Sequence, residues 1–160
     1  FRGSVPDLLS RSPFRVSLLI CFSFQFSTGK GGEAVALRIL SIGFQAEHLL
    51  RRNAALSQAG FKVDSATDAV QPRRLLRAGK YEVLVLGPYL PEDLRNNLAS
   101  EAKAANPRIA IVMLYIGSIA NAEQADTVLN AVTAEQNLAE AIRHVVQLKQ
   151  GQKISQANTG

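Results

Sequence analysis

The chain has few of the residues from which most catalytic and metal sites are built. Among its 160 residues are one cysteine, Cys21, two histidines, His48 and His144, and no tryptophan. A single cysteine excludes a disulfide within the chain and a metal site made of cysteines, and it favours a reducing compartment. Each histidine lacks Cys, Asp or Glu partners at metal-ligand spacing, so we expect both to be surface or half-buried residues. No Ser/His/Asp set, Cys/His pair or dinucleotide fingerprint occurs, and we therefore predict no metal, no cofactor and no enzymatic activity.

The body of the chain also lacks a strong excess of one charge. The formal net charge is +5, but residues 37–150 hold thirteen basic and eleven acidic side chains. The nearest basic cluster consists of residues on two expected helices: Arg51, Arg52, Arg73, Arg74, Arg77 and Lys80. We interpret them as a solvated surface rather than a polyanion site. With no helix-turn-helix motif in the sequence, we expect no nucleic-acid binding by this chain alone.

One strongly apolar run, residues 16–26, precedes the body of the chain. It is too short to span a membrane as a helix, and we predict no membrane association. It is similar to the apolar region of a signal peptide, but the STGKGGEA that follows shows no clear cleavage pattern. We favour the alternative, a disordered or non-native extension over residues 1–36. A domain over residues 37–150 and a flexible tail over residues 151–160 complete the expected organisation.

From Leu37 onward, short apolar runs alternate with helical stripes, a pattern typical of βα units around a parallel sheet. Three runs are almost continuously apolar, as central strands covered on both faces must be: residues 37–42, 81–86 and 109–114. Residues 61–66 alternate apolar and polar side chains, which suits an edge strand, and residues 126–132 are a weaker candidate for the last strand.

Caps and breakers mark the helices between these strands. Leu49 and Leu56 lie seven residues apart on the first helix, and Gly60 is placed to end it. Asp68 is a capping candidate for the second helix, and Pro72 lies in or near its first turn. The third helix should begin near Pro91 and end before residue 107, which is a proline.

Two features are expected in the last part of the chain. One is a connection that is too short to contain a long helix, and the other is a final helix with a clear start. Only ten residues separate Tyr115 from Asp126, so a fourth helix there must be very short or absent. Residues 133–136, Thr-Ala-Glu-Gln, form a capping-box pattern that should open the last helix. Its buried side should carry apolar residues from Leu138 to Val145.

With these elements in place, the segment RILSIGFQAEHLLRRNAALSQAGFKVDSATDAVQPRRLLRAGKYEVLVLGPYLP closely resembles the first half of a bacterial response-regulator receiver domain. The resemblance covers residues 37–150. It implies an α/β fold with a doubly wound, five-stranded parallel sheet in the flavodoxin- and CheY-like order 2-1-3-4-5. In this chain the fourth helix of that fold would be shortened or missing.

The same resemblance implies a degenerate phosphorylation site. The acidic pair that receivers carry after the first strand corresponds to Gly43 and Phe44, and the phosphoacceptor aspartate corresponds to Gly87. The Ser or Thr after the fourth strand corresponds to Tyr115, and the lysine after the fifth corresponds to Ala131, followed by residue 132, a valine. Glycine cannot form an acyl phosphate, and no carboxylate cluster remains to hold Mg²⁺. We therefore predict a pseudo-receiver that cannot be phosphorylated on aspartate.

Two functions follow from an emptied site. The first is a cytoplasmic protein-interaction module in or beside two-component signal transduction, with a protein partner or a second copy of the chain docking on the face altered by the short fourth helix. The second is a small-ligand sensor whose pocket, at the carboxyl ends of strands 1, 3 and 4, would be lined by Phe44, Gly87, Tyr89 and Tyr115. Alternatively, these aromatic residues simply fill the emptied space, because cores are tightly packed.

Overall fold

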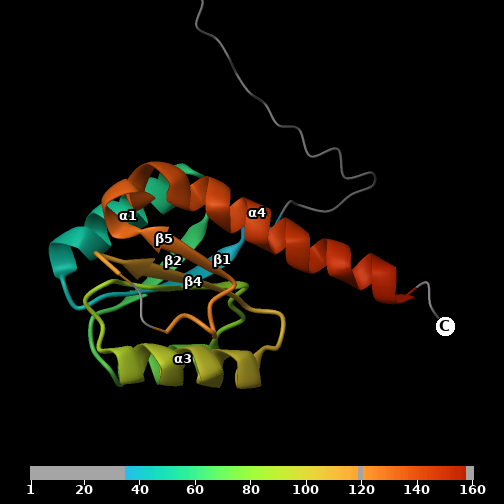
Figure 1. Cartoon of the computed structure of the whole chain (residues 1–160), viewed down its shortest axis with the longest axis horizontal. Helices are drawn as coiled ribbons and strands as arrows, with labels where there is room; N and C mark the ends of the chain where they lie inside the picture. Colours follow the sequence, from blue (N-terminus) through green and yellow to red (C-terminus); the bar gives the residue numbers. More distant parts are fainter. Residues whose placement is uncertain (1–34, 119–120, 158–160) are drawn as a thin grey trace, which may run out of the picture. The chain divides into compact units, whose positions relative to one another are not determined.

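The computed structural model describes residues 35–118 and 121–157. Strands and helices alternate along this part of the chain (Figure 1). The elements are β1 (Arg38–Ile42), α1 (Ala46–Gln58), β2 (Lys62–Ala66), α2 (Gln71–Ala78), β3 (Val83–Leu86), α3 (Glu92–Ala105), β4 (Ala110–Tyr115), β5 (Thr127–Asn130) and α4 (Ala131–Ala157). Nearly all of the expected extension over residues 1–36, together with residues 158–160, lies outside the described residues. None of the described helices is long and apolar enough to cross a membrane.

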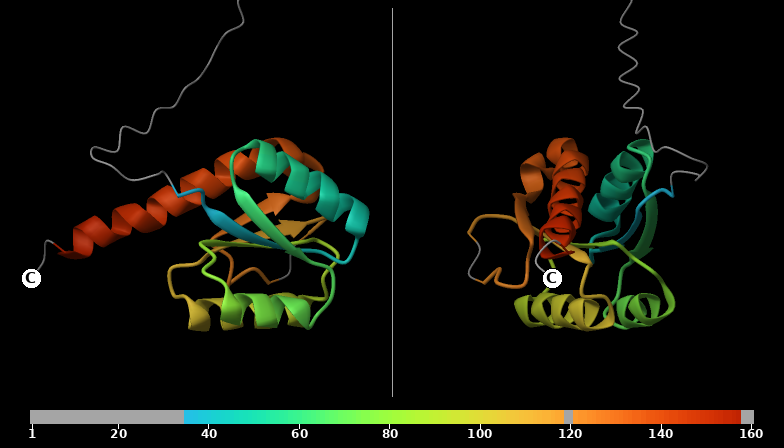
Figure 2. Two further views of the ribbon diagram at one scale, coloured as in Figure 1. Left: turned by 180° about the vertical axis from the view of Figure 1, so that it is seen from behind. Right: turned by 90° about the vertical axis from the view of Figure 1, so that its right-hand side faces the viewer.

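The five strands form one parallel sheet in the order β2-β1-β3-β4-β5, as the resemblance implied. Helices α1 and α4 cover one face of the sheet, and α2 and α3 cover the other (Figure 2). Alternate side chains of the central strands enter the two cores. Leu84 and Leu86 of β3 belong to one core, and Val83 and Val85 belong to the other. Burial on both faces explains why the sequence of β3 is continuously apolar.

The boundaries that the sequence predicted for the first three helices lie close to the observed ones. Gly60 has a φ of +93°, a left-handed conformation that glycine adopts without strain, directly after α1. Before α2, the Asp68 carboxylate accepts hydrogen bonds from the backbone N–H groups of Val70 and Gln71, at 2.8 and 2.6 Å. Pro72 lies in the first turn of that helix, and α3 begins directly after Pro91.

Helix α4 differs from the prediction at both ends. It begins at Ala131, two residues before the expected capping box, because the Asn130 side chain accepts the backbone N–H of Val132 at 2.9 Å. The Thr133 hydroxyl donates back to the Asn130 carbonyl at 3.3 Å and does not cap the helix. At the other end, α4 continues to Ala157, so residues 151–157 are helical where a flexible tail was expected.

The connection between β4 and β5 contains no helix in its described residues, 116–118 and 121–126, as the short spacing predicted. An ion pair ties this region to α4: Lys149 Nζ lies 2.8 Å from Asp126 Oδ2. The same carboxylate oxygen accepts the backbone N–H of Ile111 at 2.8 Å, and Lys149 also donates to the Ile109 carbonyl at 2.6 Å. One pair of side chains thus joins β4, the start of β5 and the last helix.

Candidate functional site

Gly87 directly follows β3, and the backbone of β1 closes the space beside it. Its N–H donates to the Ile42 carbonyl at 2.8 Å. A Cβ atom at this position would lie 2.9 Å from the same carbonyl oxygen and 3.3 Å from the Cα of Gly43. A contact below about 3.0 Å with backbone requires the backbone to move. Gly87, which the resemblance assigns to the phosphoacceptor position, therefore has no room for a side chain in this arrangement.

The side chain that occupies the neighbourhood of both glycines is Arg52, from the middle of α1. Only 6% of Arg52 is exposed to solvent. Its Nη2 lies 3.2 Å from the place of a Cβ on Gly43, and its Nη1 lies 3.4 Å from the place of a Cβ on Gly87. The guanidinium thus stands between the two positions at which the resemblance implies carboxylates.

Two hydrogen bonds hold the guanidinium in this place. Nε donates to the Ser41 hydroxyl at 2.9 Å, and Nη2 donates to the Ile42 carbonyl at 3.0 Å. Ser41 is a fully buried polar residue of β1, so the bond to Arg52 also provides its hydroxyl with a partner. A guanidinium has five N–H groups, and the other three have no hydrogen-bond partner within residues 35–118 and 121–152.

Burial weakens the preference of Arg52 for its charged form. Desolvation lowers the pKa of Arg52 from 12.5 to about 10, which still leaves the side chain charged at neutral pH. None of the ion pairs in the described part of the chain includes this residue. The site therefore carries a buried positive charge without an ion-pair partner within 4.0 Å among the described residues, which is an energetically costly arrangement.

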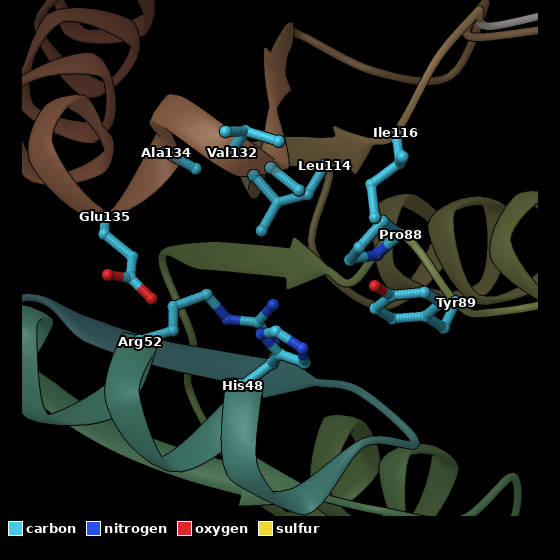
Figure 3. A pocket seen from close by; sticks show the side chains of 10 residues that line it. His48, Arg52, Pro88, Tyr89, Leu114, Ile116, Val132, Ala134 and Glu135 are labelled. Carbon is cyan, nitrogen blue, oxygen red and sulfur yellow. The ribbon is translucent and has the colours of Figure 1, made fainter.

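A pocket of about 150 Å³ lies against this charge at the carboxyl end of the sheet (Figure 3). Its lining comes from α1, the loop after β3, the end of β4 and the first turn of α4: His48, Arg52, Pro88, Tyr89, Leu114, Ile116, Ala131, Val132, Ala134 and Glu135. The Arg52 side chain points into the space between α1 and β4, and Glu135 reaches toward the same space from α4. Most of the remaining lining is apolar.

This pocket differs from the one predicted. Of Phe44, Gly87, Tyr89 and Tyr115, only Tyr89 lines it. Phe44 is 40% exposed, and Tyr115 is half-buried at the end of β4, so neither fills the emptied site. Arg52 fills it in their place. Ala131, at the position corresponding to the receiver lysine, does line the pocket as the first residue of α4.

The sequence interpretation was wrong about Arg52, which it assigned to a solvated basic cluster. Helical spacing contained the correct signal: Arg52 lies three residues after Leu49 and four before Leu56, on the same buried face of α1.

His48 and His144 are exposed, in agreement with the prediction. The ring centroids of His48 and Tyr89 lie 5.8 Å apart at the side of the pocket.

The residues at this site do not fit a Mg²⁺ ion. Gly43, Phe44 and Gly87 offer no carboxylate, and the guanidinium of Arg52 stands between Gly43 and Gly87. Elsewhere in the described chain, too, no group of three or more His, Cys, Asp or Glu side chains is placed to hold a metal ion. A cation such as Mg²⁺ requires oxygen ligands, and it is repelled by the positive charge of Arg52.

Comparison with solved structures identifies the fold as that of response-regulator receiver domains. A receiver domain from Clostridium thermocellum has a TM-score of 0.63 and 22% sequence identity, with 71% of this chain and 97% of that chain covered. The signal receiver domain of an HD-domain protein from Pseudomonas fluorescens has a TM-score of 0.64 and 20% identity, covering 72% and 98%. A third, from a sensor histidine kinase of Pseudomonas aeruginosa, was solved with magnesium in its active-site cleft; its TM-score is 0.61 at 16% identity, covering 70% and 98%.

Comparisons of sequence give no such match: no family model and no curated protein matches the chain. The resemblance at this level therefore concerns the fold alone.

Proposed function

We propose that residues 37–150 form a pseudo-receiver that does not accept a phosphoryl group on aspartate and acts as a cytoplasmic protein-interaction module in or beside two-component signal transduction. The observation that carries the proposal is the position of Arg52 between Gly43 and Gly87. A guanidinium there has the opposite charge to the carboxylates that phosphoryl transfer to aspartate requires. The proposed role includes no enzymatic step.

The interaction role is supported by what the fold retains and exposes. The five-stranded sheet keeps the receiver order, which supports a receiver-like arrangement of the elements that a partner would contact. Beside the connection that lacks a described helix, Ile116 is 50% exposed and Val132 is 79% exposed. Exposed apolar side chains of this kind are available to a protein partner or to a second copy of the chain. Binding would not depend on phosphorylation, because the acceptor is absent.

The phosphorylation part of this proposal is tested by treating the full chain with acetyl phosphate and Mg²⁺ and measuring the intact mass. We expect no phosphoryl adduct, whereas a phosphorylatable receiver domain in the same reaction acquires one. A hydroxylamine-sensitive adduct would contradict the proposal. Glu92 and Asp93, in the first turn of α3, are the acidic residues that follow β3 most closely in the sequence, so loss of such an adduct in Asp93→Asn would identify a relocated site.

A second candidate function is a small-ligand sensor. One observation favours it: a pocket at this end of the sheet is lined by the buried guanidinium of Arg52, which has no described ion-pair partner. This pocket differs in its residues from the one that the sequence predicted, but it lies at the same end of the sheet. Ligand sensing and partner binding are compatible, since a ligand between α1 and α4 would change the surface that a partner contacts.

A further inference from the structure

We propose that the pocket between α1 and the first turn of α4 binds a small organic monocarboxylate, with the carboxylate on the guanidinium of Arg52 and the apolar body against Leu114 and Ile116. This inference rests on the second candidate function and specifies its ligand class.

The charge selects an anion. Arg52 is more than nine-tenths buried, lines the pocket, and has three N–H groups without a described hydrogen-bond partner. Its bonds to Ser41 and Ile42 fix the guanidinium plane before any ligand arrives, so little side-chain freedom is lost on binding. A planar carboxylate matches the donor geometry of a guanidinium and would offset the cost of its burial.

The walls select an apolar body and provide a second attraction for the anion. Pro88, Leu114, Ile116 and Val132 supply apolar surface. The first turn of α4 forms another side of the pocket, and the N-terminus of a helix carries a partial positive charge that favours anions. A cavity of about 150 Å³ suits a small ring or a short branched chain.

The rim argues against multiply charged anions. Glu135 is exposed, belongs to the first turns of α4, and reaches toward the pocket (Figure 3). Its carboxylate repels a second negative charge on a ligand, and this repulsion is stronger for a phosphate dianion than for a monocarboxylate. The combination of one buried cation, apolar walls and an acidic rim therefore favours a singly charged acid with an apolar body.

The test is an NMR titration of the ¹⁵N-labelled full chain with benzoate, with its neutral analogue benzamide, and with inorganic phosphate. We expect benzoate to shift the Arg52 Nε–H signal and the amides of Leu114, Ile116 and Ala131. Benzamide and phosphate should each bind at least about tenfold more weakly, because one lacks the charge and the other lacks the apolar body. Equal binding of benzamide, or tighter binding of phosphate, would overturn the assigned ligand chemistry.

Two charge-matched variants locate the interaction. Arg52→Gln should weaken benzoate binding at least about tenfold, whereas Arg51→Gln should leave it unchanged. Arg51 is the adjacent, exposed residue and pairs with Glu47 at 2.9 Å, so it provides the same change in net charge away from the pocket. Equal effects of the two variants would mean that benzoate responds only to net charge, and would overturn the proposal.

A third variant keeps the test decisive if Arg52→Gln does not fold. Glu135→Gln removes the acidic rim without touching the core, and should tighten benzoate binding about two- to fivefold. An unchanged or weaker affinity would contradict the assigned pocket. Failure here is distinguishable from failure of the pseudo-receiver proposal, because the latter is measured by a phosphoryl adduct and not by benzoate.

Discussion

At the scale of single residues, the site is a buried positive charge beside two glycines. Gly43 and Gly87 leave space without carboxylates, and Arg52 reaches from α1 into that space. The buried guanidinium is held by Ser41 and by the Ile42 carbonyl, which reduces the cost of desolvation without removing it. The three positions therefore depend on one another: the guanidinium fits here because Gly43 and Gly87 have no side chains.

The closed space at Gly87 gives a prediction for stability. Gly87→Ala should destabilise the fold by about 1–3 kcal/mol, because its Cβ would lie 2.9 Å from the Ile42 carbonyl oxygen and the backbone of β1 must move. Gly151→Ala is the matched control, since a Cβ at this helical position meets nothing within 4 Å. There we expect a gain of about 0.5–1 kcal/mol. Urea unfolding measures both, and a Gly87→Ala protein as stable as the wild type would refute the close contact.

At the scale of secondary-structure elements, the clearest departure from the inferred receiver pattern is the β4–β5 connection. No helix occurs in its described residues, and α4 extends to Ala157. Asp126 and Lys149 fasten this long helix to the sheet, at the end of the strands opposite the pocket. Their side chains are only 22% and 23% exposed, so the ion pair is screened less than a surface pair would be.

We expect Asp126→Ala to cost about 1–3 kcal/mol in the free energy of unfolding. The substitution removes the partner of Lys149 Nζ and also the acceptor of the Ile111 N–H. Glu123→Ala, an exposed acidic residue of the same connection, changes the net charge equally and should cost less than about 0.5 kcal/mol. Equal costs in urea unfolding would show that the Asp126 contacts contribute little.

At the scale of the whole molecule, the fold was predictable because it depends on patterns that extend over many residues. Continuous apolar runs identified β3 and β4, and the residue spacing between Tyr115 and Asp126 excluded a long helix there. The strand order came from the resemblance to receivers rather than from periodicity. Apolar runs and the spacing between elements persist when single residues change, because each depends on many side chains.

The site around Gly43 and Gly87 was less predictable than the fold, because it depends on one side chain, that of Arg52, entering the space beside the two glycines. The absence of carboxylates at Gly43 and Gly87 was readable from the sequence, but the position of Arg52 beside them was not, since a basic residue on a helix usually faces solvent. The start of α4 was missed for a similar reason: the side chain of Asn130 binds the helix start before the more obvious Thr133 motif. Neither the burial of Arg52 nor the start of α4 after Asn130 follows from the average preferences of these residue types.

The most direct test of the central claim is an NMR titration of the full chain with beryllofluoride, a phosphoryl mimic, in the presence and absence of Mg²⁺. We predict that Mg²⁺ causes no further change in the amide signals of Gly43, Gly87 and Tyr115, because Gly43 and Gly87 supply no carboxylate and the positive charge of Arg52 lies between them. Shifts at these three residues that require Mg²⁺ and beryllofluoride together would contradict the account, since they would demonstrate that receiver-type recognition of metal and phosphoryl group survives.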